Sequence, residues 1–255
     1  MIITTACKYN IKIVSIAKEI STSYNLPFVE RKKRSIQELF DTYESNVLMV
    51  GSEKIELHTS KGTLKYHPNF AQVRIKRLLK GETDPFIEAT GLKEDSSIID
   101  CTMGMLSDSL VASYVVGITG SVTAVETIRD VHVTISSGAY RYRHTIEEIN
   151  RAAERIKTKH INAYQYLSLQ EDASVDVVYF DPMFEETIQS SSGLQSLEAL
   201  VSFSELTHET VQEARRVAKK RVVLKAHFRS QLFEEHGFIR CIRPSSVLHY
   251  GVIVK

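Results

Sequence analysis

The chain has 255 residues, 43% of them hydrophobic, and a formal net charge of +1 at pH 7. That length and apolar content are enough for a full hydrophobic core, in one large domain or in one large and one small domain. Its apolar runs are too short for a membrane span, and its first residues lack the charged and apolar regions of a signal peptide, so we expect a cytoplasmic protein with no membrane partner.

Residues 1–85 predict a small α/β domain. Strands are expected at residues 2–6, 46–50, 54–58 and 63–66, and helices at 11–24, 35–43 and 70–79. Ser35 followed by Glu38 is the capping-box pattern that begins a helix. In the helix at 70–79, Phe70, Val73 and Leu78 are expected to form the apolar face. The polar segment 81–85 ends in an Asp-Pro step and is the expected domain boundary.

This N-terminal part carries the excess of basic residues. Residues 1–92 hold 14 Lys and Arg against 10 Asp and Glu, whereas the rest of the chain holds 18 against 21. The densest run is Arg31, Lys32, Lys33 and Arg34, which suits contact with the phosphates of RNA. Ordinary solvated surface charge explains the run equally well.

From about residue 86 onward, strands and helices alternate. Strands are expected at residues 97–100, 121–126, 160–162, 175–180, 221–225, 238–242 and 247–254. Helices are expected at 106–116, at 128–157 with a break at 136–138, at 205–218 and at 229–235. This alternation predicts a mainly parallel sheet covered on both faces, with an antiparallel final pair of strands.

Three of these strands end in residues that suit a ligand site. The strand at 97–100 ends in Asp100 and opens onto a helix through Gly104, where the backbone can approach a ligand closely. The next strand ends in Glu126, a position from which a carboxylate accepts hydrogen bonds from ribose hydroxyls. The apolar strand at 175–180 delivers Asp181, and Pro182 stops its ladder. These ends would meet at one edge of the sheet.

Each strand end also has a simpler explanation. Asp100 could be a helix cap, Glu126 an acid in the first turn of a helix, and Asp181 with Pro182 a turn that ends a strand. Their order and spacing favour one site, in which the first two hold an adenosine cofactor and the third grips a flat amine. A dinucleotide-dependent oxidoreductase is disfavoured, because the first strand-helix turn lacks the sequence G-x-G-x-x-G.

The cysteines indicate neither a disulfide framework nor a zinc site. Cys7, Cys101 and Cys241 are odd in number, far apart in sequence, and without C-x-x-C spacing. We therefore expect the cysteines to be buried small hydrophobic residues, and we expect no metal.

With these residues identified, the chain resembles the class I S-adenosylmethionine-dependent methyltransferases, which implies a Rossmann-like α/β fold. From about residue 86 it is similar to the bacterial family of the small-subunit ribosomal RNA guanine-N2 methyltransferase J. Residues 87–93 and 100–108 follow that family's A-K-A-x-G-I-K and D-A-T-A-G-L-G-R-D segments. Residues 181–184 match its D-P-M-F-P, and residues 220–225 match its K-R-V-V-V-K. The resemblance makes residues 86–255 the methyltransferase domain.

The chain departs from this family pattern at several positions. Leu106 and Ser107 replace the second glycine and the arginine of the first segment, and Glu185 replaces the proline after the phenylalanine. Ala226 and His227 follow Lys225 where Arg-Pro is expected. Gly104 and Asp108 are retained, so the resemblance supports the cofactor more strongly than the identity of the substrate.

The resemblance implies S-adenosylmethionine as the cofactor and assigns residues to it. The methionine end would lie near Asp100, Thr102, Gly104 and Asp108, the ribose near Glu126, and the adenine near Asn162 and Ala163. A turn residue that closes a strand is an equally good explanation for Asn162.

On the acceptor side, the resemblance implies that Asp181 and the Pro182 carbonyl accept hydrogen bonds from an exocyclic amine while Phe184 stacks on a flipped base. Packing under a loop is the competing explanation for Phe184. Met183 and Lys225 are further candidate substrate contacts, and Lys225 could instead be solvent-exposed.

The predicted function is methyl transfer from S-adenosylmethionine to an exocyclic base amine of RNA, with guanine N2 of ribosomal RNA as the favoured target. The alternatives are methylation of DNA adenine, of a protein or of a small molecule, and a non-catalytic protein that binds an adenosine ligand and RNA.

Overall fold

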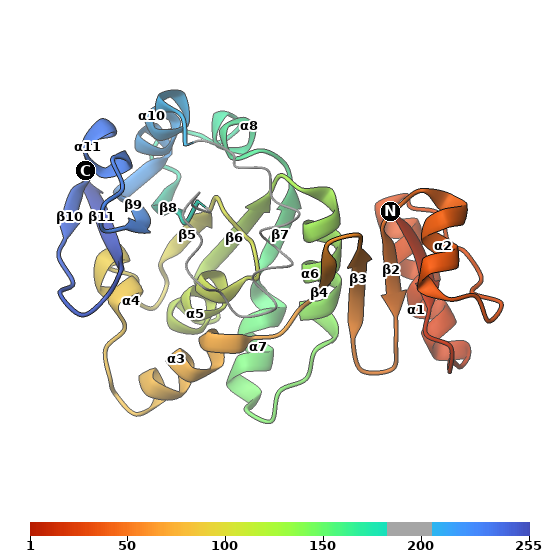
Figure 1. Ribbon diagram of the computed structural model, residues 1–255. Helices are drawn as coiled ribbons and strands as arrows, with labels where there is room; N and C mark the ends of the chain where they lie inside the picture. The colour runs from red at the N-terminus through yellow and green to blue at the C-terminus, as the bar shows by residue number, and fades with distance from the viewer. Residues whose placement is uncertain (183–205) are drawn as a thin grey trace. The chain divides into compact units, whose positions relative to one another are not determined.

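Most of the expected strands and helices are present in the computed structural model, which describes residues 1–182 and 206–255 (Figure 1). The described residues divide into two units. The first holds residues 1–67 and 128–143, and the second holds residues 68–127, 144–182 and 206–255. The predicted domains, residues 1–85 and 86–255, stay a prediction.

The first unit is a four-stranded sheet with helices. It contains β1 (Ile2–Thr5), α1 (Ile11–Tyr24), α2 (Ile36–Tyr43), β2 (Val47–Val50), β3 (Ile55–Thr59), β4 (Gly62–Lys65) and α6 (Arg129–Arg141). The strand order is β1-β2-β3-β4, with β1 parallel to β2 and the other pairs antiparallel. The predicted capping box is confirmed, because the Ser35 hydroxyl accepts from the Glu38 amide and the Glu38 carboxylate accepts from the Ser35 amide.

Helix α6 shows where one prediction was wrong. The expected break at residues 136–138 does not occur, since α6 runs without interruption to Arg141 and the next helix begins at Glu147. Gly138 lies inside α6 because its backbone packs against Tyr66: a Cβ added at Gly138 would lie 2.6 Å from the Tyr66 Cβ. The glycine therefore marks a close approach and not the end of a helix.

The second unit is a seven-stranded α/β sheet. Its helices are α3 (Asn69–Leu79), α4 (Pro85–Thr90), α5 (Ser107–Val116), α7 (Glu147–Arg155), α8 (Ala163–Ser168), α10 (His208–Val217) and α11 (Leu232–Glu235). Its strands are β5 (Ser97–Asp100), β6 (Ser121–Glu126), β7 (Lys157–His160), β8 (Val175–Phe180), β9 (Ala218–His227), β10 (Ile239–Cys241) and β11 (Leu248–Val254). The order is β10-β11-β9-β8-β5-β6-β7, and β11 runs antiparallel to both of its neighbours. The predicted Rossmann-like fold with an antiparallel last strand is confirmed.

The predicted double-sided burial of β8 is also confirmed. Val177 and Tyr179 pack into the core on one side of the sheet with Phe86, while Val178 and Phe180 pack into the core on the other side. All four strand residues are buried. A strand covered on both faces carries a continuous apolar run, as the sequence shows.

Several elements of the second unit differ from prediction. The third parallel strand, β7, spans Lys157–His160 and not residues 160–162. It lies at the edge of the sheet described here, beside β6. Its exposed lysines give it no apolar run by which a strand is recognised in the sequence. In α3 the buried residues are Ala71 and Ile75. Of the predicted apolar face, Leu78 packs against the core, but Phe70 and Val73 are exposed, so the prediction was wrong at these two residues. The short helix α4 was not predicted, although Asp84 caps it and Pro85 begins it.

The topology places a ligand site at the carboxyl ends of β5 and β8. These strands are neighbours at the centre of the sheet, and the chain leaves β5 toward β6 but leaves β8 toward β9, on the opposite side. Such a point, where the strand order reverses, is where open α/β sheets bind ligands. In the described part of the chain, no helix has the length and apolar character needed to cross a membrane.

Candidate active site

The turn after β5 is organised around the Asp100 carboxylate. Its Oδ1 accepts hydrogen bonds from the Thr102 amide at 3.0 Å and the Thr102 hydroxyl at 3.3 Å, and its Oδ2 accepts from the Ser109 hydroxyl. Asp100 is buried, and this burial raises its pKa to about 7 against the three donors that favour the charged form. The carboxyl group is therefore poised to change its ionisation near neutral pH.

Leu106 occupies a backbone conformation that normally favours glycine. Its φ is 61°, and it precedes the first residue of α5 at the position where the resembled family has glycine. A left-handed conformation is strained for a leucine. Its side chain is buried, and this packing offsets the strain. This turn therefore has, at a leucine, a backbone conformation that a glycine would adopt without strain.

Glu126 closes the other side of this turn. It is the last residue of β6, and its Oε2 accepts a hydrogen bond from the Gly104 amide at 3.2 Å. Gly104 has φ of 44°, and Met103 donates its amide to the Val125 carbonyl at 2.9 Å. The structure thus brings the ends of β5 and β6 together, with a carboxylate and a glycine backbone side by side.

The end of β8 joins the same cluster. The Asp181 amide donates to the Thr102 hydroxyl at 2.7 Å, which links the turn after β5 to the Asp181-Pro182 step. The Asp181 side chain is 29% exposed, and its Oδ2 accepts from Lys225 Nζ at 2.6 Å. Burial raises the pKa of Asp181, with Lys225 opposing the rise and Asp108 adding to it.

Asp108, in the first turn of α5, lies at the centre of a buried charge network. Its Oδ2 accepts from the Tyr179 hydroxyl at 2.8 Å and from Lys225 Nζ at 3.1 Å, and its Oδ1 accepts from the Arg74 guanidinium. Arg74 also forms a two-pronged ion pair with Asp84, at 2.7 and 2.8 Å. Burial alone would raise the pKa of Asp108, but Lys225 and Arg74 outweigh it and hold the pKa well below its usual range.

Lys225 bridges Asp108 and Asp181. Its side chain is 19% exposed, so it is mostly buried and does not lie in open solvent. Burial would lower the pKa of Lys225, but the two carboxylates together raise it above its usual value. Lys225 therefore stays charged and connects the charge network to the predicted acceptor residue.

The network includes residues that sequence reasoning did not assign to the site, namely Arg74, Asp84, Ser109 and Tyr179. The Asp84-Pro85 step is a helix-start signal that could have located α4 and its cap. Nothing local in the sequence pairs Arg74 with Asp108, since 34 residues separate them.

Asn162 is the N-cap of α8, and Ala163 is the first residue of that helix. The Asn162 Oδ1 accepts from the Tyr164 and Gln165 amides at 2.9 and 3.4 Å. Asn162 follows β7, whose last residue, His160, is paired with Glu126. Its side-chain oxygen thus has a structural role, and its predicted contact with adenine stays a prediction.

The basic run in the first unit separates into inward and outward residues. Arg31 is only 9% exposed and donates to the Thr5 carbonyl at 3.4 Å and to the Arg34 carbonyl at 2.9 Å. Arg34 donates to the Glu30 carbonyl at 2.7 Å and packs over the Tyr43 ring. Lys32 and Lys33 are exposed. Arg31 therefore stabilises the loop, and the lysines are the residues of this run that present charge outward.

Met183 and Phe184 lie outside the described residues, so their predicted roles stay predictions. Among residues 1–182 and 206–255, no cluster of three or more His, Cys, Asp or Glu side chains is arranged to hold a metal ion.

The residues at the strand ends suit a cofactor with positive charge and hydroxyl groups. Asp100, Asp108, Glu126 and Asp181 supply four carboxyl groups against the two cations Arg74 and Lys225, as the contacts above show. A sulfonium and an ammonium are favoured in such surroundings. Glu126 also stands at the strand end from which ribose hydroxyls are usually bound. The donor set therefore fits S-adenosylmethionine.

We expect the Asp100→Asn substitution to flatten the pH dependence of stability. The folded-state pKa of about 7 lies above the usual value for aspartate, so the free energy of unfolding falls as pH rises between these two pKa values. From pH 5 to pH 8 the free energy of unfolding of the native chain should fall by about 2–3 kcal/mol through this group. The variant lacks the titrating carboxyl and should not show this fall. Urea unfolding at both pH values measures this difference, with the exposed Asp41→Asn as control. Equal pH slopes in Asp100→Asn and the native chain would contradict the assignment.

Comparison with known proteins identifies the family of the chain. A family model described as "Putative SAM-dependent methyltransferase" matches residues 32–239. The chain is 40% identical over 252 residues to the uncharacterized protein YpiP of Bacillus subtilis, and the match covers 98% of each protein.

Two further relatives carry a more specific name. The chain is 31% identical over 150 residues to ribosomal RNA small subunit methyltransferase J of Hydrogenovibrio crunogenus, covering 57% of this chain and 53% of that protein. It is 26% identical over 243 residues to the protein of that name in Chromobacterium violaceum, covering 91% and 87%.

A solved structure shares the fold. The SAM-dependent methyltransferase NGO1261 from Neisseria gonorrhoeae is similar with a TM-score of 0.64 and 18% identity, over 100% of this chain and 96% of that one. Because the family model matches most of the chain, the chain belongs to this family of S-adenosylmethionine-dependent methyltransferases.

Proposed function

We propose that this methyltransferase transfers its methyl group to the exocyclic amine of a base in RNA, with guanine N2 of ribosomal RNA as the target. The observation that carries the proposal is the Asp181-Pro182 step at the carboxyl end of β8, tied by the Asp181 amide to Thr102 in the turn after β5. The relatives named ribosomal RNA small subunit methyltransferase J support the choice of RNA.

The cofactor, when bound, supplies an activated methyl group on a positively charged sulfur. We assign Asp100, Thr102 and Gly104 to its methionine end and Glu126 to its ribose. Asp108 is assigned an indirect role, in which its carboxylate binds Lys225 and Arg74. Asn162 and Ala163 are assigned to the adenine through their place at the start of α8.

Asp181 and Pro182 are assigned to the acceptor amine. Lys225 binds Oδ2 of Asp181, which leaves Oδ1 as the atom that accepts one amine hydrogen, while the Pro182 carbonyl accepts the other. The lone pair of an aryl amine is delocalised into its ring, and two acceptors on its hydrogens favour the pyramidal form that can attack the methyl carbon. As the carbon–nitrogen bond forms, the bond from that carbon to sulfur would break and S-adenosylhomocysteine would leave. The Asp181 carboxylate is then placed to accept the proton that the methylated amine loses. Orientation and electrostatics of this kind are sufficient for methyl transfer.

The remaining predicted substrate contacts are assigned different roles in this proposal. Phe184 is assigned to stacking on the target base and Met183 to the wall of its pocket. Lys225 is assigned to holding Asp181 and not to an RNA phosphate, since its ammonium lies between two carboxylates. In the basic run, Lys32 and Lys33 are assigned to phosphate contacts, because Arg31 is turned inward.

Labelled-methyl transfer onto undermodified RNA, DNA and protein in parallel tests this proposal. We expect label in RNA, and nucleoside analysis of that RNA should find N2-methylguanosine. Label in another RNA nucleoside would keep RNA but overturn guanine N2. Label only in DNA or in protein would overturn RNA as the substrate.

A further inference from the structure

The first unit contains a groove between α1, the turn joining β2 to β3, and the end of α6. The groove has a volume of about 300 Å³. Its lining residues come from these three segments, namely Lys12 and Ile16, residues 51–55, and Gly138, Tyr140, Arg141 and Arg143. We call it the α1–α6 groove. All of its residues belong to the first unit, so it is distinct from the methyltransferase site.

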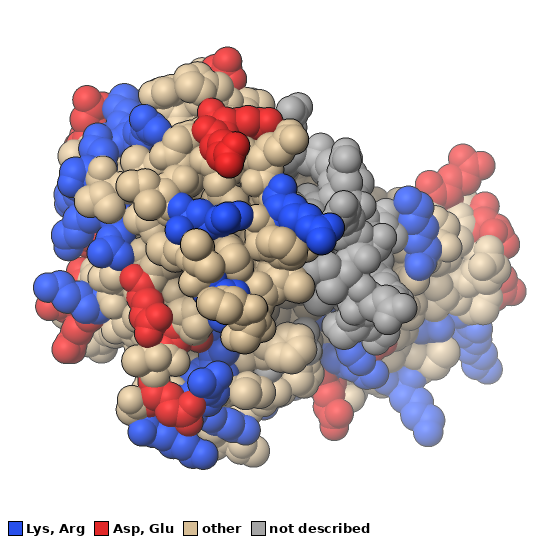
Figure 2. All heavy atoms as spheres, turned by 60° about the vertical axis from the view of Figure 1, so that its left-hand side comes forward, with Lys and Arg blue, Asp and Glu red and all other residues tan. Residues whose placement is uncertain are grey.

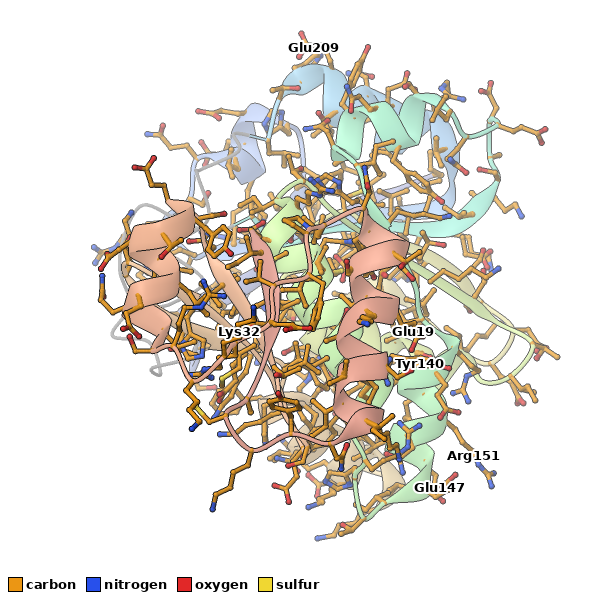
Figure 3. The ribbon with its side chains drawn as sticks, turned by 90° about the vertical axis from the view of Figure 1, so that its right-hand side faces the viewer. Glu19, Lys32, Tyr140, Glu147, Arg151 and Glu209 are labelled. Atoms are coloured by element: carbon orange, nitrogen blue, oxygen red, sulfur yellow. The ribbon has the colours of Figure 1, made fainter. Side chains whose placement is uncertain are left out.

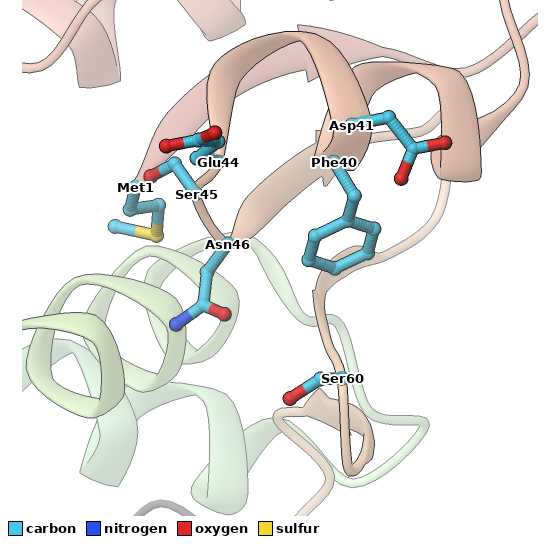
Figure 4. Close-up of a pocket in the computed structure, with 7 residues that line it drawn as sticks. All are labelled: Met1, Phe40, Asp41, Glu44, Ser45, Asn46 and Ser60. Carbon is cyan, nitrogen blue, oxygen red and sulfur yellow. The ribbon is translucent and has the colours of Figure 1, made fainter.

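Positive charge distinguishes the α1–α6 groove from another hollow of the same unit. Its lining holds Lys12, Lys54, Arg141 and Arg143 against one acid, Glu53. The hollow drawn in Figure 4 is lined by Asp41 and Glu44 and by no lysine or arginine. Of these two hollows, the α1–α6 groove is the one that an anionic ligand fits.

Two of the groove's cations are paired with acids. Arg141 pairs with Glu19 on α1 at 2.9 Å, and Figure 3 labels Glu19 and also Tyr140, the residue before Arg141 on α6. Lys54 pairs with Glu56 on β3 at 3.0 Å, while its own side chain remains 58% exposed. Lys12 is exposed at the first turn of α1. The groove thus presents several cations from different elements along one surface.

An aromatic ring stands among these cations. Tyr140 is 63% exposed, although tyrosine rings are usually more buried. An exposed ring beside lysines and arginines is the combination that binds single-stranded nucleic acid, in which bases stack on aromatic faces and phosphates meet cations. An acidic peptide would use the cations but would gain nothing from the ring.

Figure 2 shows lysines and arginines gathered along the left-hand edge of the face that it draws, with acids at several other points of that face. Positive charge alone is therefore not special to the α1–α6 groove. The exposed ring among its cations is the feature that adds recognition of a base.

We propose that the α1–α6 groove binds single-stranded RNA, with Lys12 and Lys54 on phosphates and Tyr140 stacked on a base. The proposal rests on RNA being the substrate, as proposed above, and adds where on the first unit that RNA is held. Because the groove is separate from the Asp181 site, it should contribute to RNA affinity and not to the chemical step.

Salt-dependent binding of a fluorescent single-stranded RNA to the full chain tests the groove. Each lost phosphate contact on single-stranded RNA changes the slope of log K against log salt by about 0.7. The double variant Lys12→Gln, Lys54→Gln loses two such contacts, so its slope should be shallower by about 1.4. Tyr140→Ala should weaken binding by about 5- to 150-fold, from the 1–3 kcal/mol of one base stack, and leave the slope unchanged. The control is Lys93→Gln with Lys219→Gln, the same charge change on exposed residues near the amino ends of β5 and β9.

Methylation kinetics with RNA then separate the groove from the proposed function. The groove variants should raise KM for RNA and keep kcat, and their unchanged circular dichroism would show that they fold. Suppose that the native chain methylates RNA, but the groove variants keep the native salt slope and the native KM. That result would overturn RNA binding by the groove and leave the proposed function intact. Failure of the native chain to bind or methylate RNA would overturn the proposed function. Groove-dependent binding of polyglutamate but not of RNA would assign the groove to an acidic peptide instead.

Discussion

Asp181→Ala should lower kcat for methyl transfer by about 10²–10³-fold, the usual loss when one preorganised hydrogen-bonding group is removed from a transition state. The cofactor should still bind, because the carboxylates that we propose to hold it, Asp100 and Glu126, belong to other strands. Single-turnover transfer to the acceptor identified by labelling, together with calorimetric titration of S-adenosylhomocysteine, measures both effects.

Two variants make this result specific. Asp176→Ala makes the same change near the other end of β8, where Asp176 pairs with the exposed Lys220 at 2.7 Å, and it should leave kcat nearly unchanged. Glu126→Ala should weaken S-adenosylhomocysteine binding instead. Native activity in Asp181→Ala would remove Asp181 from the mechanism, and loss of cofactor binding in that variant would reassign it to the cofactor.

Lys225→Met should destabilise the fold by about 3–5 kcal/mol, the typical cost of removing one partner from a buried ion pair. It leaves Asp108 and Asp181 without the cation that joins them. Both carboxyls can take up a proton at low pH, so the loss of stability should be larger at pH 8 than at pH 5. Urea unfolding at the two pH values measures it.

The same substitution should change the pH profile of activity. Lys225 lowers the pKa of Asp181, so its removal raises that pKa further. Because Asp181 must be ionised to accept an amine hydrogen, the acidic limb of kcat should move to higher pH. Lys225→Arg, which keeps the charge, should restore part of both properties.

A surface ion pair supplies the matched control for Lys225. Lys220→Met breaks the pair with Asp176, in which the lysine is 56% exposed, and such pairs contribute only about 0–1 kcal/mol. Equal destabilisation by Lys220→Met and Lys225→Met would show that burial of the network has no special effect. An unshifted acidic limb in Lys225→Met would separate Lys225 from Asp181 in function.

Much of the fold could be predicted because its signals are local. Continuous apolar runs separated by amphipathic segments define β8 and its neighbours, and caps such as Ser35 with Glu38 define helix starts. The errors lie where a residue's role depends on a distant neighbour. Gly138 suggested a break, but Tyr66 required the glycine inside α6.

The candidate site divides in the same way. Asp100, Glu126 and Asp181 could be predicted because parallel strands bring their carboxyl ends to one edge, so a strand-end position is enough to place them. The residues whose charges set the ionisation of these acids could not be predicted from the sequence. Arg74 is paired with Asp84 and with Asp108, which lies 34 residues further along the chain.

The sequence by itself thus determined the succession of strands along the chain and the acids at their ends, because both depend on local pattern. Its resemblance to a known family gave the class of reaction. Only the tertiary structure decided which charges are buried and paired. It joined Lys225 to Asp108 and Asp181, turned Arg31 inward to the Thr5 carbonyl, and left Lys12 and Lys54 outward. The physical reason is that the ionisation of a side chain and its availability to a ligand depend on solvent exposure and on partners distant in sequence.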